Sequence, residues 1–425
     1  MAIDKQTLTT VLVDRIEIIQ RLPLIEREIV FEELLPTIIT GVRRCGKSYL
    51  LYQKMNELVK KGHEWNEFIY INFEDERLIS FDVNDFNLLL EAYYSISKKD
   101  PILFLDEIQN ITGWQKFARR MADEKRIIFI TGSNSKMLSN EMEMTLGGRY
   151  ISAQIYPYAF TEYLKAKNFT WSVKTLFSTK RKTDIIQYFD DYLEYGGFPE
   201  LANIVNKRDY LSSIYNKIFL GDIIMRHGVS NIIALEVMMK KIAETLRHPI
   251  SFSRLSNIVT SVGISVGKST IIQYLEYAKE SQLIFSINNF ASKLVDKVTT
   301  PKYYFVDTGL LNLFVLDAKS ALLENLIAIN LLKKYGRDDV YYYQDNIEVD
   351  FYLPRNSLLI QSCYSLADIK TKDREINALI KLSKHVEVHE MMIITYDEET
   401  MINVDNLVIK VIPVWKWLLM ENIER

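Results

Sequence analysis

The chain has 425 residues, of which 48% are hydrophobic and 25% are charged, and its formal net charge is −3. This length is enough for two or three domains with substantial cores. The near balance of charge excludes a chain-wide field that would recruit nucleic acid or an acidic membrane. The two cysteines, Cys45 and Cys363, are too few for a disulfide framework or a zinc ligand set. No apolar run reaches about 18 residues and no signal peptide is evident, so we expect a cytoplasmic protein without a membrane span.

The first 35 residues are predicted to be helical and to lead into a strand. Val11, Ile16, Ile19 and Leu22 recur at helical spacing and form an amphipathic stripe. The apolar run that ends at residues 38–40 then predicts the first strand of a sheet.

The next stretch, residues 41–48, reads GVRRCGKS and matches the phosphate-loop pattern G-x-x-x-x-G-K-[ST] at every specified position. A strand before the loop and an amphipathic helix after it give the required context, because backbone N–H groups and the positive helix end then face the phosphates. Lys47 is expected to reach the β- and γ-phosphates, and the Ser48 hydroxyl to bind Mg²⁺. We predict that ATP contacts the whole loop, namely Gly41, Val42, Arg43, Arg44, Cys45, Gly46, Lys47, Ser48 and Tyr49.

A second motif follows on another predicted strand. The strand at 68–73 ends in three acids at 74–76, which we interpret as a solvated strand end. The stretch PILFLDEIQN at 101–110 then delivers Asp106 and Glu107 at the carboxyl end of an apolar strand. Asp106 is expected to hold Mg²⁺ beside Ser48, and Glu107 to polarise the attacking water. A water-activating carboxylate favours hydrolysis of ATP over transfer of its phosphate to a second substrate.

Polar residues after the next strand, at 126–131, face the same crevice in a doubly wound sheet. Ser133 and Asn134 are candidates to sense the γ-phosphate or its water, and Thr131 ranks below them. A turn that caps the following helix is an equally weighted alternative. Arg149, after a glycine pair, is a candidate to stabilise transition-state charge within its own subunit or across a subunit interface; the alternative is a surface ion pair.

GVRRCGKS, YINFED, LFLDEIQ, TGSNS and GGR occur in this order and spacing, and with them the chain resembles the archaeal and bacterial AAA-type ATPases that carry a long C-terminal extension. The resemblance extends over nearly the whole chain through YPYAFTEYL, YGGFP and GDIIMRHGV. It implies an α/β fold with a P-loop core of parallel strands at 1–154. It further implies a helical lid at 155–240, a winged-helix-like segment at 241–297 and a restriction-endonuclease-like α/β domain at 298–425.

The middle of the chain is predicted to be helical and aromatic-rich at 155–240, and we interpret the aromatic stripe as core. Residues 248–290 predict a helix–turn–helix. The outward residues of its second helix include Lys268, Gln273, Glu276 and Glu280, a poor charge balance for phosphate contacts. We therefore favour a structural or protein-contact role for this segment over DNA binding.

The last third looks similar to the PD-(D/E)XK nuclease fold, in which a helix acid, a strand Asp and an E-x-K motif supply the metal site and a lysine. Glu324 and Asp350 match the two acids, but the E-x-K position reads Gln361-Ser-Cys363. An amide is a weak Mg²⁺ ligand and a thiol suits softer ions, so we predict an inactive domain. Glu348, on the same side of its strand as Asp350, leaves a rebuilt site open.

Taken together, the sequence predicts an ATPase that uses ATP and Mg²⁺ and acts as a molecular switch on a partner. Its catalytic residues would be Glu107, Lys47, Arg149, Ser133 and Asn134, and its metal ligands Ser48 and Asp106. The candidate partners are a second copy of the chain and a protein that binds the C-terminal domain, and DNA is a less favoured candidate. A minor hypothesis is redox control through Cys45, whose pKa the loop would lower.

Overall fold

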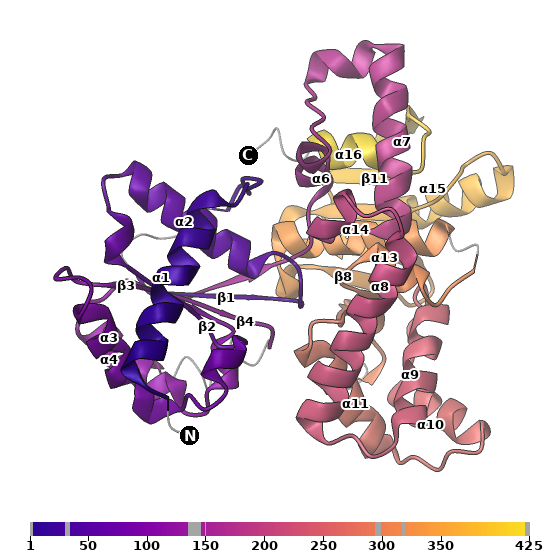
Figure 1. Cartoon of the computed structure of the whole chain (residues 1–425). Helices are drawn as coiled ribbons and strands as arrows, with labels where there is room; N and C mark the ends of the chain where they lie inside the picture. The colour runs from indigo at the N-terminus through magenta and orange to yellow at the C-terminus, as the bar shows by residue number, and fades with distance from the viewer. Residues whose placement is uncertain are drawn as a thin grey trace. The chain divides into compact units, whose positions relative to one another are not determined.

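The computed structural model describes residues 3–29, 35–134, 146–148, 150–293, 299–316 and 319–420. They form two compact units (Figure 1). Unit 1 comprises Met1–Tyr156 and Glu280–Gln282, and unit 2 comprises Pro157–Lys279 and Leu283–Arg425. Each unit has its own sheet. No helix in these described ranges is both long and apolar enough to cross a bilayer.

Unit 1 is built on a parallel sheet in the order β2-β3-β4-β1-β5. Its strands and helices alternate along the chain, which is the pattern that produces parallel sheets. In chain order they are α1 (Lys5–Arg21), β1 (Thr37–Gly41), α2 (Lys47–Lys60), β2 (Phe68–Asn72), α3 (Phe86–Tyr94), β3 (Ile102–Asp106), α4 (Trp114–Asp123), β4 (Ile128–Gly132) and β5 (Ile151–Ile155).

The two faces of this sheet have different cores because side chains alternate along each strand. One face carries aliphatic residues such as Ile69, Leu103 and Ile130, which pack in one cluster with residues of α1, α3 and α4. The opposite face is aromatic and lies against α2, where the Tyr52 ring meets that of Tyr70 at 5.3 Å. This packing fixes α2, and with it the loop before it, on the sheet.

The register places the polar ends of three strands side by side. Thr40 of β1 lies opposite Gly132 of β4, and Leu105 of β3 lies opposite Ile130 of β4. The carboxyl ends of β1, β3 and β4 therefore meet at one edge, where open α/β sheets bind ligands.

Two expectations for unit 1 are wrong. The first helix ends at Arg21 and residues 22–29 are irregular, because Pro23 holds Leu22 in an extended conformation with ψ 130°. The acidic segment after β2 is not simply solvated, since Asp75 is buried and its carboxylate bonds Arg15 and Arg77. The sequence did not show that α1 packs on β2 and brings Arg15 there.

Unit 2 combines helices with a mixed sheet in the order β12-β13-β11-β10-β9-β8-β6-β7. The strands are β6 (Ile284–Asn289), β7 (Lys302–Phe305), β8 (Tyr341–Gln344), β9 (Glu348–Leu353), β10 (Leu358–Ser362), β11 (Glu390–Thr395), β12 (Thr400–Val404) and β13 (Leu407–Pro413). The helices are α6 (Phe160–Ala166), α7 (Thr179–Tyr195), α8 (Lys207–Asn216), a π-helix (Lys217–Met225), α9 (Ile232–Glu244), α10 (Phe252–Ser261), α11 (Lys268–Glu280), α13 (Thr308–Asn312), α14 (Lys319–Tyr335), α15 (Ile369–Ser383) and α16 (Val414–Met420).

The aromatic stripe of the helical region is core, as predicted. Phe160 and Tyr163 of α6 pack with Phe189 and Tyr192 of α7, and all four are buried. Farther on, α10 and α11 occupy the two expected helices of the helix–turn–helix, and the next strand, β6, joins the large sheet. The winged-helix and nuclease-like assignments, and the boundaries at 240 and 297, stay predictions.

Candidate active site

The loop between β1 and α2 is shaped by two left-handed residues and one close contact. Arg44 has φ 63° and Gly46 has φ 98°, so the backbone turns sharply before entering α2. A Cβ on Gly41 would lie 2.6 Å from both Cys45 Sγ and Ile155 O. The first glycine of the pattern is therefore required by packing as well as by phosphate approach.

The buried Arg27, which the sequence did not reveal, hydrogen-bonds the backbone of this loop. Arg27 donates from one terminal nitrogen to Cys45 O at 3.1 Å and from the other to Tyr156 O at 3.0 Å. Its own amide donates to Gln53 Oε1 of α2 at 2.8 Å. The irregular segment before β1 thus fixes the phosphate loop, α2 and the end of unit 1 to one another.

Lys47 begins α2 and lies almost fully buried at the mouth of the loop. Its Nζ is 3.2 Å from Gly41 O, 3.4 Å from Val42 O and 3.2 Å from Glu107 Oε1. Burial by itself lowers the pKa of Lys47, but Glu107, Cys45 and Asp106 together outweigh it and raise the pKa above its ordinary value. The side chain therefore carries a permanent ammonium that can exchange these acceptors for phosphate oxygens.

Asp106, at the end of β3, is fully buried and receives three hydroxyl groups. Tyr70 OH donates to Oδ2 at 2.7 Å, Thr131 Oγ1 donates to Oδ1, and Ser48 of the loop also hydrogen-bonds the carboxylate. Burial and then the neighbouring Glu107 charge raise the pKa of Asp106. A divalent cation bound here would stabilise the ionised form of this buried carboxylate, and the neighbouring serine hydroxyl offers a second oxygen ligand.

Glu107 follows in a left-handed conformation, with φ 53°, which is costly for a residue that has a side chain. Its amide donates to Thr131 Oγ1 at 3.0 Å, and its Oε2 accepts from Gln109 Nε2 at 2.5 Å. Burial alone would raise the pKa of Glu107, but Lys47 and Gln109 hold it below its ordinary value. The carboxylate is therefore ionised, as a group that orients water must be.

The structure brings together most of the predicted site and adds residues to it. Ser133 is buried and accepts from Gln109 Nε2 at 3.4 Å, whereas Asn134 is half-buried. Thr131, ranked lowest of the three, is the one that bonds Asp106 and the Glu107 amide. Gln109, two residues after Glu107, was missed, although it belongs to the same motif as the two acids. Arg149 lies outside the described residues.

The outer positions of the loop differ from one another. Arg43 pairs with Glu74 at 2.6 Å, while Arg44 and Tyr49 are exposed and Val42 is buried. The expectation that the loop lowers the pKa of Cys45 is wrong. The thiol is fully buried, and its desolvation raises its pKa despite the charges of Lys47 and Arg27. A protonated, inaccessible thiol is a poor target for oxidants.

In the described part of the chain, two buried polar atoms without hydrogen-bond partners also fit a site that binds a triphosphate with Mg²⁺. Among the described residues, Thr40 Oγ1 and Gln109 Oε1 are buried without a hydrogen-bond partner. Both belong to the residues that border the loop and Glu107, and buried polar atoms normally find partners. The site therefore has a lysine ammonium, a helix N-terminus, a carboxylate–serine pair and unsatisfied polar atoms in one place.

The sheet, the loop and this polar edge define a P-loop ATPase-type domain, and residues 35–164 match the family model of the AAA domain. The chain belongs to the same family as uncharacterized protein MJ1544 of Methanocaldococcus jannaschii, to which it is 37% identical over 98% of this chain and 96% of that protein. An uncharacterized protein of Haemophilus influenzae is 32% identical over 90% and 94% of the two chains. In unit 2, residues 186–321 match a domain of unknown function (DUF8612).

Solved structures are more distant. The Walker-type ATPase PABY2304 of Pyrococcus abyssi is 15% identical, with a TM-score of 0.42 over 70% of this chain and 99% of that one. The Orc1 protein of Aeropyrum pernix, solved in complex with DNA, is 12% identical, with a TM-score of 0.32 over 77% and 93% of the two chains. Neither likeness is close enough to bear on function.

Replacing Tyr70 by phenylalanine is expected to raise the Mg²⁺ concentration needed for half-maximal ATPase activity by about tenfold. The ring packing survives, but Asp106 loses a hydroxyl donor, and a hydrogen bond to a charged group contributes roughly 1.5 kcal/mol or more. Titration of Mg²⁺ at saturating ATP checks this. Tyr52→Phe is the control, since Tyr52 OH lies 3.1 Å from Tyr70 OH and does not bond Asp106 directly. Equal effects of the two changes would contradict the role of Tyr70.

Proposed function

We propose that this chain is a Mg²⁺-dependent ATPase whose AAA-type domain binds and hydrolyses ATP. The observation that carries the proposal is the convergence of Lys47, Asp106 and Glu107 at one edge of the parallel sheet, with Lys47 Nζ 3.2 Å from Glu107. A charge pair of this kind is poised to open when an anion competes for the lysine.

Each residue has a defined part in the proposed reaction. Lys47 and the loop amides, from Gly41 to Tyr49, bind the phosphates, and Ser48 and Asp106 hold Mg²⁺, which when bound neutralises phosphate charge. Release from Lys47 frees the Glu107 carboxylate to accept a hydrogen bond from the attacking water. Gln109 and Ser133 keep Glu107 in place, with Asn134 as a further contact of the water. Arg149 is proposed to stabilise the developing charge, from its own or a neighbouring subunit.

We further propose that hydrolysis switches unit 2 between states that differ in affinity for a protein partner. DNA is the second candidate, through α11. On that helix the Glu276 carboxylate lies 2.5 Å from Lys279, which removes one cation from the phosphate-binding count. The exposed Gln273 and Glu276 add no positive charge. This charge pattern favours a protein partner.

Calorimetry with the full chain tests the proposal. We expect heat from ATP binding at a single site, stronger binding when Mg²⁺ is present, and measurable release of inorganic phosphate. Absence of any heat from ATP with Mg²⁺ in folded protein would refute it. In the same preparation, DNA affinity that depends on nucleotide and falls steeply with salt would favour the second candidate. A rate of ATP hydrolysis per chain that rises with protein concentration would favour an oligomer.

A further inference from the structure

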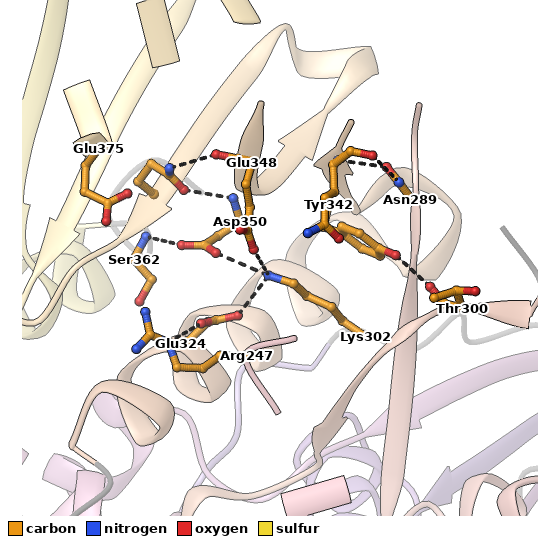
Figure 2. Close-up of polar contacts among 12 residues, drawn as sticks. Arg247, Asn289, Thr300, Lys302, Glu324, Tyr342, Glu348, Asp350, Ser362 and Glu375 are labelled. Atoms are coloured by element: carbon orange, nitrogen blue, oxygen red, sulfur yellow. Dashed lines mark hydrogen bonds and ion pairs between the residues drawn. The ribbon is translucent and has the colours of Figure 1, made fainter. Parts of the chain in front are cut away.

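A cluster of three carboxylates in unit 2 comes from two elements, α14 and β9 (Figure 2). Glu324 belongs to α14, while Glu348 and Asp350 lie on the same side of β9. Glu324 is 1% exposed and Asp350 is 9% exposed. Carboxylates at such depth require compensation by positive charge or by hydrogen bonds.

That compensation comes from Lys302 of β7, which the sequence reasoning missed. Its side chain is fully buried, and its Nζ lies 3.3 Å from Asp350 Oδ1, 3.5 Å from Glu324 Oε1 and 3.7 Å from Glu348 Oε1 (Figure 2). One ammonium therefore meets all three acids, in the position that a shared cation would take.

The other oxygens of the two buried acids are also engaged. Glu324 Oε1 accepts from Tyr304 OH at 2.9 Å, and its Oε2 accepts from Arg247 Nε at 3.2 Å. Asp350 Oδ2 accepts from the Ser362 amide at 3.0 Å. Every carboxylate oxygen of Glu324 and Asp350 thus has a protein donor.

Gln361, at the position where the nuclease pattern has its second acid, has a different task here. Its Oε1 accepts from the Asp350 amide at 2.8 Å, and its Nε2 donates to Glu348 O at 3.2 Å. An ionised carboxylate has no donor for the second of these bonds. The amide therefore fits a residue that fixes β9 to β10, and it leaves no acid at this position for a metal.

We propose that Lys302 is the permanent counter-ion of this cluster. Its ammonium occupies the place that a divalent metal ion would otherwise take between the carboxylates, and so prevents metal binding there. It ties β7 to α14 and β9 by charge. A second cation at the same oxygens would have to displace Lys302 and the other donors, because every carboxylate oxygen of Glu324 and Asp350 already has one. Gln361 supplies no further acid that would compensate for this loss. The C-terminal domain is then a structural or partner-binding module.

The groups that face Lys302 support a fixed charge. Burial lowers the pKa of Lys302, yet Glu324, Asp350 and Glu348 outweigh burial and raise it above its ordinary value. Other charged or titratable neighbours of the cluster include Arg247, Tyr304, Tyr342, Arg374 and Glu375. Because a lysine with a raised pKa stays protonated below that pKa, Lys302 keeps its charge at neutral pH. Burial raises the pKa of Glu324 even beside Lys302, so the ammonium is the fixed charge of the cluster.

The first test is a double-mutant cycle on the full chain. Lys302→Met keeps the length of the side chain and removes its charge, so we expect the unfolding equilibrium constant to rise by roughly a hundred- to a thousandfold. Lys372→Met, at an exposed position of α15, is the matched control with little effect. Adding Glu324→Gln to Lys302→Met should cost less than the sum of the single changes, by about tenfold or more. Strict additivity would overturn the ion-pair role.

The second test needs no destabilised lysine variant. Wild type and Asp350→Asn are titrated with Mn²⁺ alone and followed by thermal unfolding, so that any difference reports this cluster. We expect the same response to Mn²⁺ in both proteins, and no DNA cleavage that depends on Asp350. A Mn²⁺-dependent stabilisation or cleavage that Asp350→Asn removes would overturn the proposal and show an open metal site.

Discussion

Replacing Glu107 by glutamine is expected to slow ATP hydrolysis by about two to four decades while ATP still binds. The side chain keeps its shape but loses the charge that attracts a proton of the attacking water. Loss of that charge also removes the ion pair with Lys47, whose Nζ lies 3.2 Å from Glu107 in the structure. We therefore expect ATP affinity to be equal to or higher than that of the wild type, because the phosphates no longer compete with the carboxylate for Lys47.

Single-turnover hydrolysis and nucleotide binding, measured on the same preparation, separate the two effects. Glu76→Gln serves as the control, because Glu76 is an exposed acid after β2. We expect this variant to hydrolyse ATP at the wild-type rate. Normal turnover in Glu107→Gln would remove this carboxylate from the mechanism of hydrolysis.

Replacing Lys47 by alanine is expected to weaken ATP binding by about 10- to 100-fold and to reduce turnover further. The binding loss follows from the removal of a charge-assisted contact, which contributes roughly 1.5–3 kcal/mol. Turnover suffers more because the same ammonium stabilises charge on the transferred phosphate. Binding is measured by calorimetry and turnover by phosphate release.

Stability must be followed in this variant, since Glu107 is buried and loses its cation. We expect a lower melting temperature in Lys47→Ala and an unchanged one in Lys60→Ala, whose side chain on the same helix is 71% exposed. Wild-type binding and turnover in folded Lys47→Ala would disprove the assignment of the phosphate loop.

The local motifs of unit 1 could be predicted because they depend on neighbours in sequence. The strand–loop–helix around Lys47 and the strand that ends at Asp106 both lie where the sequence places them. Tyr70, Thr131 and Arg27 could not be assigned in this way. Their contacts with Asp106 and the loop depend on the register of β2, β3 and β4 and on the path of an irregular segment.

In unit 2, the local sequence pattern predicted the two acids but not the lysine that packs against them. Glu324 and Asp350 were found by pattern, and the structure does bring them together. Lys302 could not be found in this way because it lies on β7, a different element from those of the two acids. A lysine next to tyrosines in a strand is typical of a surface position. The buried contacts of Lys302 with α14 and β9 depend on how these elements pack around β7, which no local pattern shows.

The two hydrogen bonds of Arg27 have a mechanical consequence. One guanidinium holds the carbonyl of Cys45 in the phosphate loop and that of Tyr156, and the chain passes into unit 2 directly after Tyr156. A shift of the loop when its occupant changes would therefore pull on the first peptide of the connection, through one rigid planar group. We therefore expect Arg27 to link the loop to the connection, in addition to the direct link through β5, which ends at Ile155.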